Sequence, residues 1–447
     1  MYCRYCIISS GDNPDAFPLL LVCRLRHSDQ LTRFSNRIPA DGKPLMIRQP
    51  DGFPFVPWRG RVILLLAVHL VGTAGYMSVM AMAPVIRTDL GLTAADFGFF
   101  LSAFFASQVL TALPSGLMTD RFGVGWTLSL AMLMMAVGMG LFAMTPGFSG
   151  GVVAMFIMGL GYSLVNPATA KGVLTWYPRN RRATAMGIKQ FGVPVGGVVG
   201  AGGGMLVVLI DWRLVLMLIA GATLVIGGLW LLFARRPTRD DRGFRGILKD
   251  LRAVLGHPSL GIICISNIAF SIGQSSLFAY LTLFLRDATA LSQPLASLGT
   301  GLSQAASAGG RIGFSYLSDV FMGGRRKWII VGLIIAGGAS VTIAAFANPG
   351  WPAPVLILLA VGMGGTIASY AALILSMTVE TVEPRLSGGA IGYNALAWSL
   401  GGAIGPPLFG YVLDISGAYG PAWLTIAGVL FFGALFMAVA FREKPSD

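Results

Sequence analysis

Long apolar segments follow one another through most of the chain, and they limit its fold more than any other feature. A helix needs about 20 apolar residues to cross the roughly 30 Å of a bilayer core. Segments of this kind lie at 62–86, 95–118, 126–145, 151–176, 184–210, 213–234, 258–286, 295–318, 328–347, 352–378, 387–412 and 419–441. Only 11% of the residues are charged, whereas a soluble protein carries about a quarter. The sequence therefore predicts an all-α membrane protein with twelve transmembrane helices, embedded in the lipid bilayer.

The loop charges predict how these helices are oriented. Cytoplasmic loops of membrane proteins are enriched in Lys and Arg. One set of loops carries clusters of basic residues at 179–182, 235–257 and 325–327, whereas the other set carries Arg87, Arg213 and Arg286. We therefore expect a multi-pass protein of the plasma (inner) membrane with both termini in the cytoplasm. The net charge of +13 is then a topology signal, and we expect no binding to nucleic acid.

The longest basic loop divides the chain into two halves. The first six apolar segments fall within 58–234 and the last six within 258–447, which includes a short tail. We expect each half to form a bundle, joined by a cytoplasmic linker at 235–257. Residues 1–57 are polar and dotted with proline. We expect them to form a cytoplasmic extension that is disordered or lies upstream of the true start.

The chain offers little material for metal binding or catalysis. It contains four cysteines and three histidines. Cys3 and Cys6 form a Cys-x-x-Cys pair without further ligands at a suitable spacing. No cluster of catalytic side chains stands out in one plane of the predicted spans. We therefore expect no enzymatic activity, no metal site and no cofactor.

A glycine pattern repeats between the two halves. Small residues allow helices in membranes to pack closely. Four glycines of the segment 184–210 recur at one constant interval in the segment 387–412: Gly187, Gly196, Gly197 and Gly200 match Gly392, Gly401, Gly402 and Gly405. An internal repeat of this kind predicts halves of similar structure. We therefore expect two pseudo-symmetric six-helix bundles.

A short charged loop indicates the class of protein. Between 95–118 and 126–145 the chain reads Gly116-Leu-Met-Thr-Asp120-Arg121-Phe-Gly123-Val-Gly125. A tight reversal requires glycine, which tolerates positive φ. A degraded copy ends in Ser318-Asp319-Val320-Phe-Met-Gly323-Gly324-Arg325-Arg326-Lys327, where Val320 replaces the arginine. The pattern Gly-x-x-x-Asp-Arg-x-Gly resembles the loop between the second and third helices of major facilitator superfamily transporters, and the resemblance covers about 58–441.

The resemblance implies a mechanism of alternating access, in which two bundles rock around a central cavity. It also implies gating roles for these loop residues: Gly116, Asp120, Arg121 and Gly123 in the first copy, and Asp319, Arg325 and Arg326 in the second. A carboxylate at a membrane surface can cap a helix end in the other half. We therefore expect Asp120 to stabilise the outward-facing state.

Departures from relatives narrow the substrate class. Proton-coupled drug antiporters of the superfamily have an arginine where this chain has Met155 and a proline where it has Ala201. The run that begins at Trp176-Tyr177-Pro178 and ends at Lys189-Gln190 resembles the sugar-phosphate, organic-anion and cyanate-permease side of the superfamily. We expect a monomeric secondary active transporter of a small organic anion, with a coupling proton or an exchanged anion. A multidrug efflux antiporter and a non-transporting receptor or sensor remain alternatives.

Three cations within the predicted spans support the anion hypothesis, namely Lys171, Lys189 and Arg311. Ionisable groups at such depth face protein or water rather than lipid. Lys189 has no acidic residue within four positions on its own helix, so it must meet a carboxylate from another helix, water or substrate. Lys171 could also extend to the lipid headgroups. For Arg311 we expect a structural ion pair with Glu380.

Polar residues on the predicted central helices complete the expected substrate site. Besides Lys171 and Lys189, it includes Tyr76, Asn166, Gln190, Gln274, Tyr393, Asn394 and Trp398. For each of these residues an interhelical hydrogen bond is the alternative role.

The predicted orientation can be tested by chemical labelling. A single cysteine placed in the loop 235–257 should not react with a membrane-impermeant maleimide added to intact cells, because that loop is expected in the cytoplasm. A cysteine at Ser149, in a loop of the other side, should react. Labelling of the first position and protection of the second would reverse the topology.

Overall fold

The computed structural model describes residues 58–112, 114–177, 182–232, 254–383 and 386–443, and its regular structure in these ranges is helical without strands. The helices are α1 (Trp58–Ala81), α2 (Ala83–Leu90), α3 (Ala94–Thr111), α4 (Pro114–Met144), α5 (Phe148–Trp176), α6 (Arg182–Leu206), α7 (Trp212–Leu232), α9 (Pro258–Asp287), α10 (Gln293–Phe321), α11 (Lys327–Ala344), α12 (Ala353–Ile367), α13 (Ala371–Thr381), α14 (Ser387–Ser416) and α15 (Tyr419–Ala440). The predicted extension at 1–57 and most of the predicted linker at 235–257 lie outside the described residues.

Most of these helices are suited to a bilayer. In the described part of the chain, ten segments are long and apolar enough to cross a membrane, and α12 and α13 together form one of them. Two further helices, α6 and α10, lie at predicted spans but contain more glycine and polar residues. The prediction of an all-helical membrane protein is confirmed, and the number of twelve spans stays a prediction.

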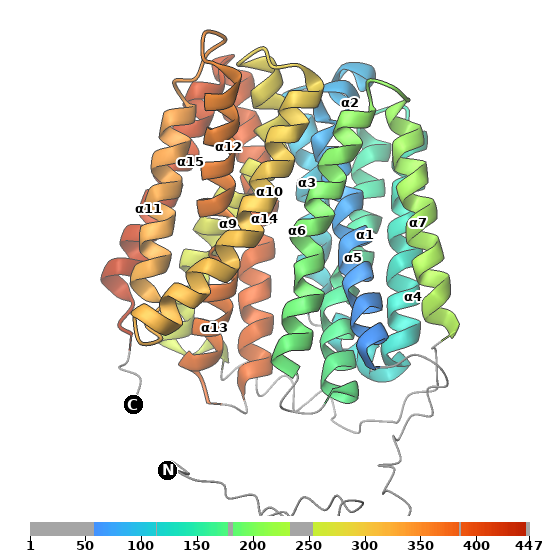
Figure 1. Cartoon of the computed structure of the whole chain (residues 1–447), viewed down its shortest axis with the longest axis vertical. Coiled ribbons are helices and arrows are strands. Elements are labelled where there is room, and N and C mark those ends of the chain that lie inside the picture. The colour runs from blue at the N-terminus through green and yellow to red at the C-terminus, as the bar shows by residue number, and fades with distance from the viewer. Residues whose placement is uncertain (1–57, 113, 178–181, 233–253, 384–385, 444–447) are drawn as a thin grey trace, which may run out of the picture. The chain divides into compact units, whose positions relative to one another are not determined.

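The helices form two groups that follow the two halves of the sequence (Figure 1). In the first group α1 packs on α6, and α4 packs on both α5 and α7. In the second group α14 packs on α9, α10 on α12, and α11 on α15. Between the groups, α3 packs against α14 and α6 against α10. The helices α3, α6, α10 and α14 therefore form the seam between the groups.

Glycines allow α6 and α14 to approach a helix of their own group at backbone distance. A side chain at Gly196 would collide with the carbonyl oxygen of Leu70 in α1. A side chain at Gly401 would collide with the carbonyl oxygen of Ile268 in α9. The two glycines are equivalent in the predicted repeat, and they occupy equivalent positions in the fold.

The next residue of each helix faces the other group. A side chain at Gly197 would meet Gln304 of α10, and one at Gly402 would meet the ring of Phe105 in α3. In each helix, the first glycine of the pair thus faces a helix of the same group, and the second faces a helix of the other group. The internal repeat predicted from glycine spacing is therefore confirmed, because equivalent glycines of α6 and α14 make equivalent packing contacts.

The helix α1 begins, and α15 ends, at one face of the molecule, here called the terminal face (Figure 1). The other face, here called the opposite face, carries the connections from α2 to α3, from α9 to α10 and from α14 to α15. These names describe the fold without assigning a side of the membrane.

An acidic side chain near the end of α14 joins it to the beginning of α3 at the opposite face. The carboxylate of Asp414 accepts hydrogen bonds from the backbone amides of Ala94 and Ala95, at 3.0 and 2.8 Å. The first amides of a helix have no partner within the helix and carry partial positive charge. Nearby, the hydroxyl of Tyr280 donates to the carbonyl of Ala94 at 2.7 Å, with the carbonyl of Pro406 3.0 Å away.

The second half of the seam closes in the same way. The side-chain nitrogen Nε2 of Gln293, at the start of α10, donates to the carbonyls of Ala81 and Gly204 at 2.9 and 3.1 Å. Gln293 and Gly204 lie at the ends of α10 and α6 that reach the opposite face, as Asp414 and Ala94 do in α14 and α3. These contacts hold the two groups together at the opposite face.

The cap on α3 yields a test of this closure. Asp414→Asn should weaken the closed opposite face, because a carboxylate at a helix N-terminus contributes about 0.3–1 kcal/mol, and up to about 2 kcal/mol when partly buried. Spin labels at Ser149 and Phe346 would report the distance between the groups at that face. We expect a larger population with a long distance.

Asp96→Asn is the matched control. Asp96 caps the same helix end, but its partner is the backbone amide of Thr93 in the same group. This variant should leave the distance distribution unchanged. An equal response of both variants would show that Asp414 supports α3 rather than the contact between the groups.

Candidate functional site

Arg311 lies on α10 between the two groups, and its side chain is half-buried. Side chains on a helix tilt toward its N-terminus, which for α10 lies at the opposite face. The guanidinium Nε donates to the carbonyl of Ala368 at 3.2 Å, and no other hydrogen-bond partner or carboxylate pairs with it in the described part of the chain. The hydroxyl groups of Tyr76, Tyr162 and Tyr370 lie within electrostatic range of this cation.

The carbonyl that binds Arg311 comes from a break in a membrane helix. The helix α12 ends at Ile367 and α13 begins at Ala371. Within a continuous helix each carbonyl accepts from the amide four residues further on, whereas the break leaves the carbonyl of Ala368 to other donors. It accepts from the hydroxyl of Ser307 at 2.9 Å as well as from Arg311.

Aromatic packing positions two of the tyrosines. The ring of Tyr76 lies 4.5 Å from that of Phe104 and 5.7 Å from that of Tyr162, measured between centroids. The hydroxyl of Tyr370 is buried and has no hydrogen-bond partner in the part of the chain that the structure describes. Leaving a buried polar group unpaired costs about 1–3 kcal/mol. A polar group of a bound solute could relieve this cost.

The predicted ion pair between Arg311 and Glu380 is wrong. Both carboxylate oxygens of Glu380 accept from Nη1 of Arg326 at 2.9 Å, and Nη2 of the same arginine lies 3.4 Å from Asp319. Glu380 lies near the end of α13 at the terminal face, whereas Arg311 is about 15 Å from the end of its own helix. The two side chains therefore lie at different depths.

Lys189 is buried, with an exposed fraction of 2%, and its partners are neutral. Its ammonium lies 2.9 Å from the hydroxyl of Thr169 and 3.4 Å from the amide oxygen of Asn166, both on α5. The ring nitrogen Nε2 of His69 lies 3.1 Å from the same hydroxyl. No carboxylate pairs with Lys189 in the described residues. Of the three expectations for this lysine, the structure therefore does not support a carboxylate from another helix.

Lys171 occupies a different position from the one predicted. Its ammonium forms an ion pair with Asp120 at 2.7 Å, near the terminal face and within the first group. A second acceptor is the carbonyl of Thr119 at 3.4 Å. The charge of Lys171 is thus paired at the membrane surface, as the alternative of an extended lysine anticipated. In this conformation Lys171 does not join the residues around Arg311.

Three predicted substrate residues of the second group are engaged in contacts between α9 and α14. Asn267 donates to the side chain of Asn394 at 2.8 Å, and the indole of Trp398 donates to Gln274 at 2.9 Å. The hydroxyl of Ser271 donates to the carbonyl of Trp398 at 2.6 Å. Interhelical hydrogen bonding, the alternative role, is therefore what the structure shows for these residues.

The other predicted lining residues differ in exposure. Asn166 is exposed although it lies inside the membrane helix α5, where Pro167 follows it. Gln190 is half-buried beside Lys189 and its side-chain oxygen has no partner in the described chain. Tyr393 is half-buried and lies nearer the terminal face, early in α14. The side-chain oxygen of Gln190 is thus without a partner among the described residues, whereas that of Asn166 lies 3.4 Å from the ammonium of Lys189.

The two charged loops use glycine as predicted. Gly123 interrupts α4 with φ of 79°, and Gly323 and Gly324 have φ of 58° and 78°. These left-handed conformations suit glycine. Gly116 lies in the helical part of α4, with open space around it. Their roles in gating stay a prediction.

The remaining gating residues divide by their contacts. Arg326 bridges Asp319 and Glu380. Arg121 is exposed, with its guanidinium over the ring of Phe122. Arg325 donates its backbone amide to the carbonyl of Met322 in the turn before α11.

Two residues near Arg311 and Lys189 escaped the sequence analysis. Tyr162 follows Gly161, whose missing side chain allows α5 to lie against α4. Thr169 links His69 to Lys189. Their helical spacing, seven residues apart on one face of α5, was the available signal.

Comparison with known proteins identifies the family. The model of the Major Facilitator Superfamily matches residues 64–381 and 263–447. The chain belongs to this superfamily of transporters.

Individual relatives and structures agree with this assignment. The chain is 25% identical to the hexuronate transporter of Bacillus subtilis (strain 168), over 84% of this chain and 94% of that protein. It is 23% identical to a putative tartrate transporter of Agrobacterium vitis, over 86% and 90% of the two chains. A bacterial homolog of the human lysosomal transporter Spinster, solved in an inward-facing and occupied conformation, shares the fold with a TM-score of 0.70 and 17% identity, covering 87% of this chain and 97% of the other.

The environment of Lys189 predicts an effect on stability. Lys189→Gln should raise the midpoint of thermal unfolding of the purified protein, because a buried ion with only neutral partners carries a desolvation penalty of several kcal/mol. Lys171→Gln is the control and should not raise it, because Lys171 is half-exposed and paired. A lower midpoint for Lys189→Gln would contradict the interpretation that this charge is uncompensated.

Proposed function

We propose that this protein is a secondary active transporter that moves a small organic anion by alternating access, with Arg311 as the main anion ligand. The observation that carries the proposal is the guanidinium of Arg311, which has no carboxylate partner in the described chain. A buried or half-buried arginine with one backbone acceptor leaves several N–H donors free. A carboxylate accepts two parallel hydrogen bonds from such a group, which makes the pair both strong and geometrically specific.

The surrounding hydroxyls support a site shared by both groups of helices. Tyr76 and Tyr162 come from the first group, whereas Tyr370 and Arg311 come from the second. Binding sites of such transporters lie near the middle of the membrane at the interface between the repeats. A solute held from both sides interacts differently in each arrangement of the bundles, and this difference is what couples binding to rocking.

The neighbouring polar groups favour a hydroxylated carboxylate as substrate. Asn166 presents an amide group beside Lys189, Gln190 follows Lys189 in the chain with an unpaired side-chain oxygen, and the tyrosine hydroxyls lie within electrostatic range of Arg311. One relative is named a hexuronate transporter and another a putative tartrate transporter, and both of these anions carry carboxylates and hydroxyls. A solute with a carboxylate and several hydroxyls would satisfy both sets of donors and acceptors.

We also assign the terminal face to the cytoplasm, in the plasma (inner) membrane. The basic loops of the sequence support this orientation. With it, the contacts of Asp414 and Gln293 close the outer side. In this state Asp120 is paired with Lys171 of its own group. Its predicted role as a cap on the other group belongs to the outward-facing state.

The transporter is expected to work as a monomer. The transported anion would move with a proton or exchange for a second anion. Counterflow of labelled tartrate in proteoliposomes, with and without an imposed pH gradient, distinguishes these two forms of coupling.

The anion site can be tested through Arg311. Arg311→Gln should raise the dissociation constant of tartrate or glucuronate by roughly 10- to 100-fold, since hydrogen bonds to charged groups contribute about 1.5–3 kcal/mol. Arg311→Lys should recover part of the affinity, because an ammonium keeps the charge but lacks the fork of donors. Isothermal titration calorimetry on purified protein, followed by uptake into proteoliposomes, measures both effects.

Arg213→Gln serves as the control, because Arg213 is paired with Asp89 at the opposite face. It should bind both anions like the wild type. Unchanged affinity in Arg311→Gln would refute the assignment of this residue. A wild-type protein that binds only neutral or cationic compounds would refute the proposed substrate class.

A further inference from the structure

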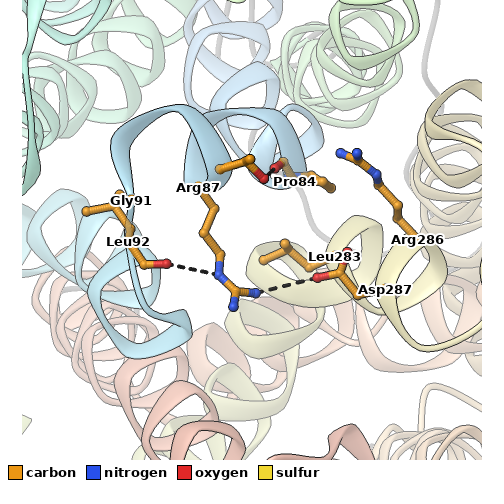
Figure 2. Close-up of a pocket in the computed structure, with 8 residues that line it drawn as sticks. Pro84, Arg87, Gly91, Leu92, Leu283, Arg286 and Asp287 are labelled. Carbon is orange, nitrogen blue, oxygen red and sulfur yellow. Dashed lines mark hydrogen bonds and ion pairs between the residues drawn. The ribbon is translucent and has the colours of Figure 1, made fainter.

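A second group of cations lies at the opposite face, away from Arg311. A cavity of about 330 Å³ opens there between α2 of the first group and the end of α9 in the second. Its lining includes Arg87 and Thr88 of α2 and Leu283, Arg286 and Asp287 of α9 (Figure 2). The cavity is therefore built by both halves of the protein.

Arg87 uses only part of its guanidinium for internal contacts. Its Nε donates to the carbonyl of Leu92 at 3.1 Å, and its Nη1 lies 3.5 Å from the carboxylate of Asp287 (Figure 2). The same carboxylate accepts from the hydroxyl of Tyr419 at 3.2 Å. Arg87 itself also interacts with the hydroxyl of Tyr419.

Arg286 has no hydrogen-bond or ion-pair partner among the described residues. Its Nη1 atom is buried and unpaired, although the residue as a whole is half-buried. In Figure 2 its guanidinium lies apart from the contact between Arg87 and Asp287. Arginine stays charged at all physiological pH values and presents five donors. A donor of this kind requires an acceptor from outside the described chain.

The charges of the lining leave a positive excess. The lining contains two arginines and one carboxylate, and that carboxylate pairs with Arg87 and accepts from Tyr419. Charged groups with free donors in a recess bind anions more strongly than they do on an open surface, because screening by water is reduced. The volume of the cavity is sufficient for a small carboxylate with its hydration water.

We propose that this cavity is a second anion-binding site, in which Arg286 and Arg87 hold a small carboxylate at the opposite face. The site does not depend on the one at Arg311, which lies on a different helix nearer the terminal face. Because its two arginines belong to different groups of helices, the bound anion would contact both groups. The phosphate of an anionic lipid presents the same chemistry and is distinguished from a soluble anion by the experiment.

The experiment measures protection of a cysteine in the cavity wall. Thr88, which is exposed and lines the cavity, is replaced by cysteine in the full chain, with the four native cysteines changed to serine. The purified protein in neutral detergent is labelled with N-ethylmaleimide, an uncharged reagent that the arginines do not attract. At a tartrate concentration about twice the dissociation constant of the cavity at Arg286, labelling should slow about threefold, because the fraction of unoccupied cavities is 1/(1 + [L]/Kd).

Three substitutions in this background separate the two anion sites. Arg286→Gln should abolish the protection. Arg213→Gln should retain it, because this arginine lies at the same face but outside the cavity and is paired with Asp89. Arg311→Gln should also retain it, so a failure of the proposed transport site would not remove the effect.

A lipid arm identifies the source of the anion. The same labelling is performed without tartrate in nanodiscs of phosphatidylcholine and of phosphatidylglycerol. Protection by phosphatidylglycerol that requires Arg286 would assign the site to a lipid headgroup, whereas protection by tartrate alone would assign it to a soluble carboxylate. Absence of protection in both arms, or protection that survives Arg286→Gln, would overturn the proposal.

Discussion

The close approach of helix backbones along α6 and α14 is the constraint on which the rest of the structure depends. Each of these helices must pack against a partner in its own group and against a helix of the other group. Consecutive glycines, Gly196 and Gly197 in α6 and Gly401 and Gly402 in α14, leave room on both sides. The contact with the other group is made by side chains that lie over the second glycine of each pair, Gln304 over Gly197 and the ring of Phe105 over Gly402. The same glycines therefore support both the packing of each bundle and the contact between the two groups.

The second constraint is the scarcity of carboxylates within the spans. At the terminal face Lys171 is paired with Asp120, and Arg326 with Glu380. Deeper in the membrane, Arg311 and Lys189 have only neutral partners among the described residues. An unpaired cation in a medium of low dielectric constant is costly. The protein tolerates this cost at two positions next to hydroxyl and amide groups, which is where an anionic solute would reduce it.

The sequence predicted the fold well because its main signals are local. Apolar length and glycine spacing are read directly along the chain, and the structure confirms the helices and the repeat they indicate. The candidate site was harder to predict. The absence of an acidic residue near Lys189 on its own helix could be read from the sequence. The partner of Arg311 could not, because it depends on how deep in the membrane each charged side chain lies. Whether Glu380 reaches Arg311 or Arg326 follows from where α13 ends relative to α10, and no local pattern records that relation. Tyr162 was missed because its spacing from Thr169 along α5 indicates a shared face but does not show which helix lies opposite that face.

The break between α12 and α13 makes α13 a short separate helix in the second group. Tyr370 stands at the first end of α13, beside the carbonyl that Arg311 binds, and Glu380 stands near its last turn in the ion pair with Arg326. The helix between them has 11 residues and a length of about 16 Å. A rigid rod of this kind converts a small tilt at one end into a displacement at the other. A solute that contacts both Tyr370 and Arg311 would therefore act on a helix whose other end holds the ion pair at the terminal face.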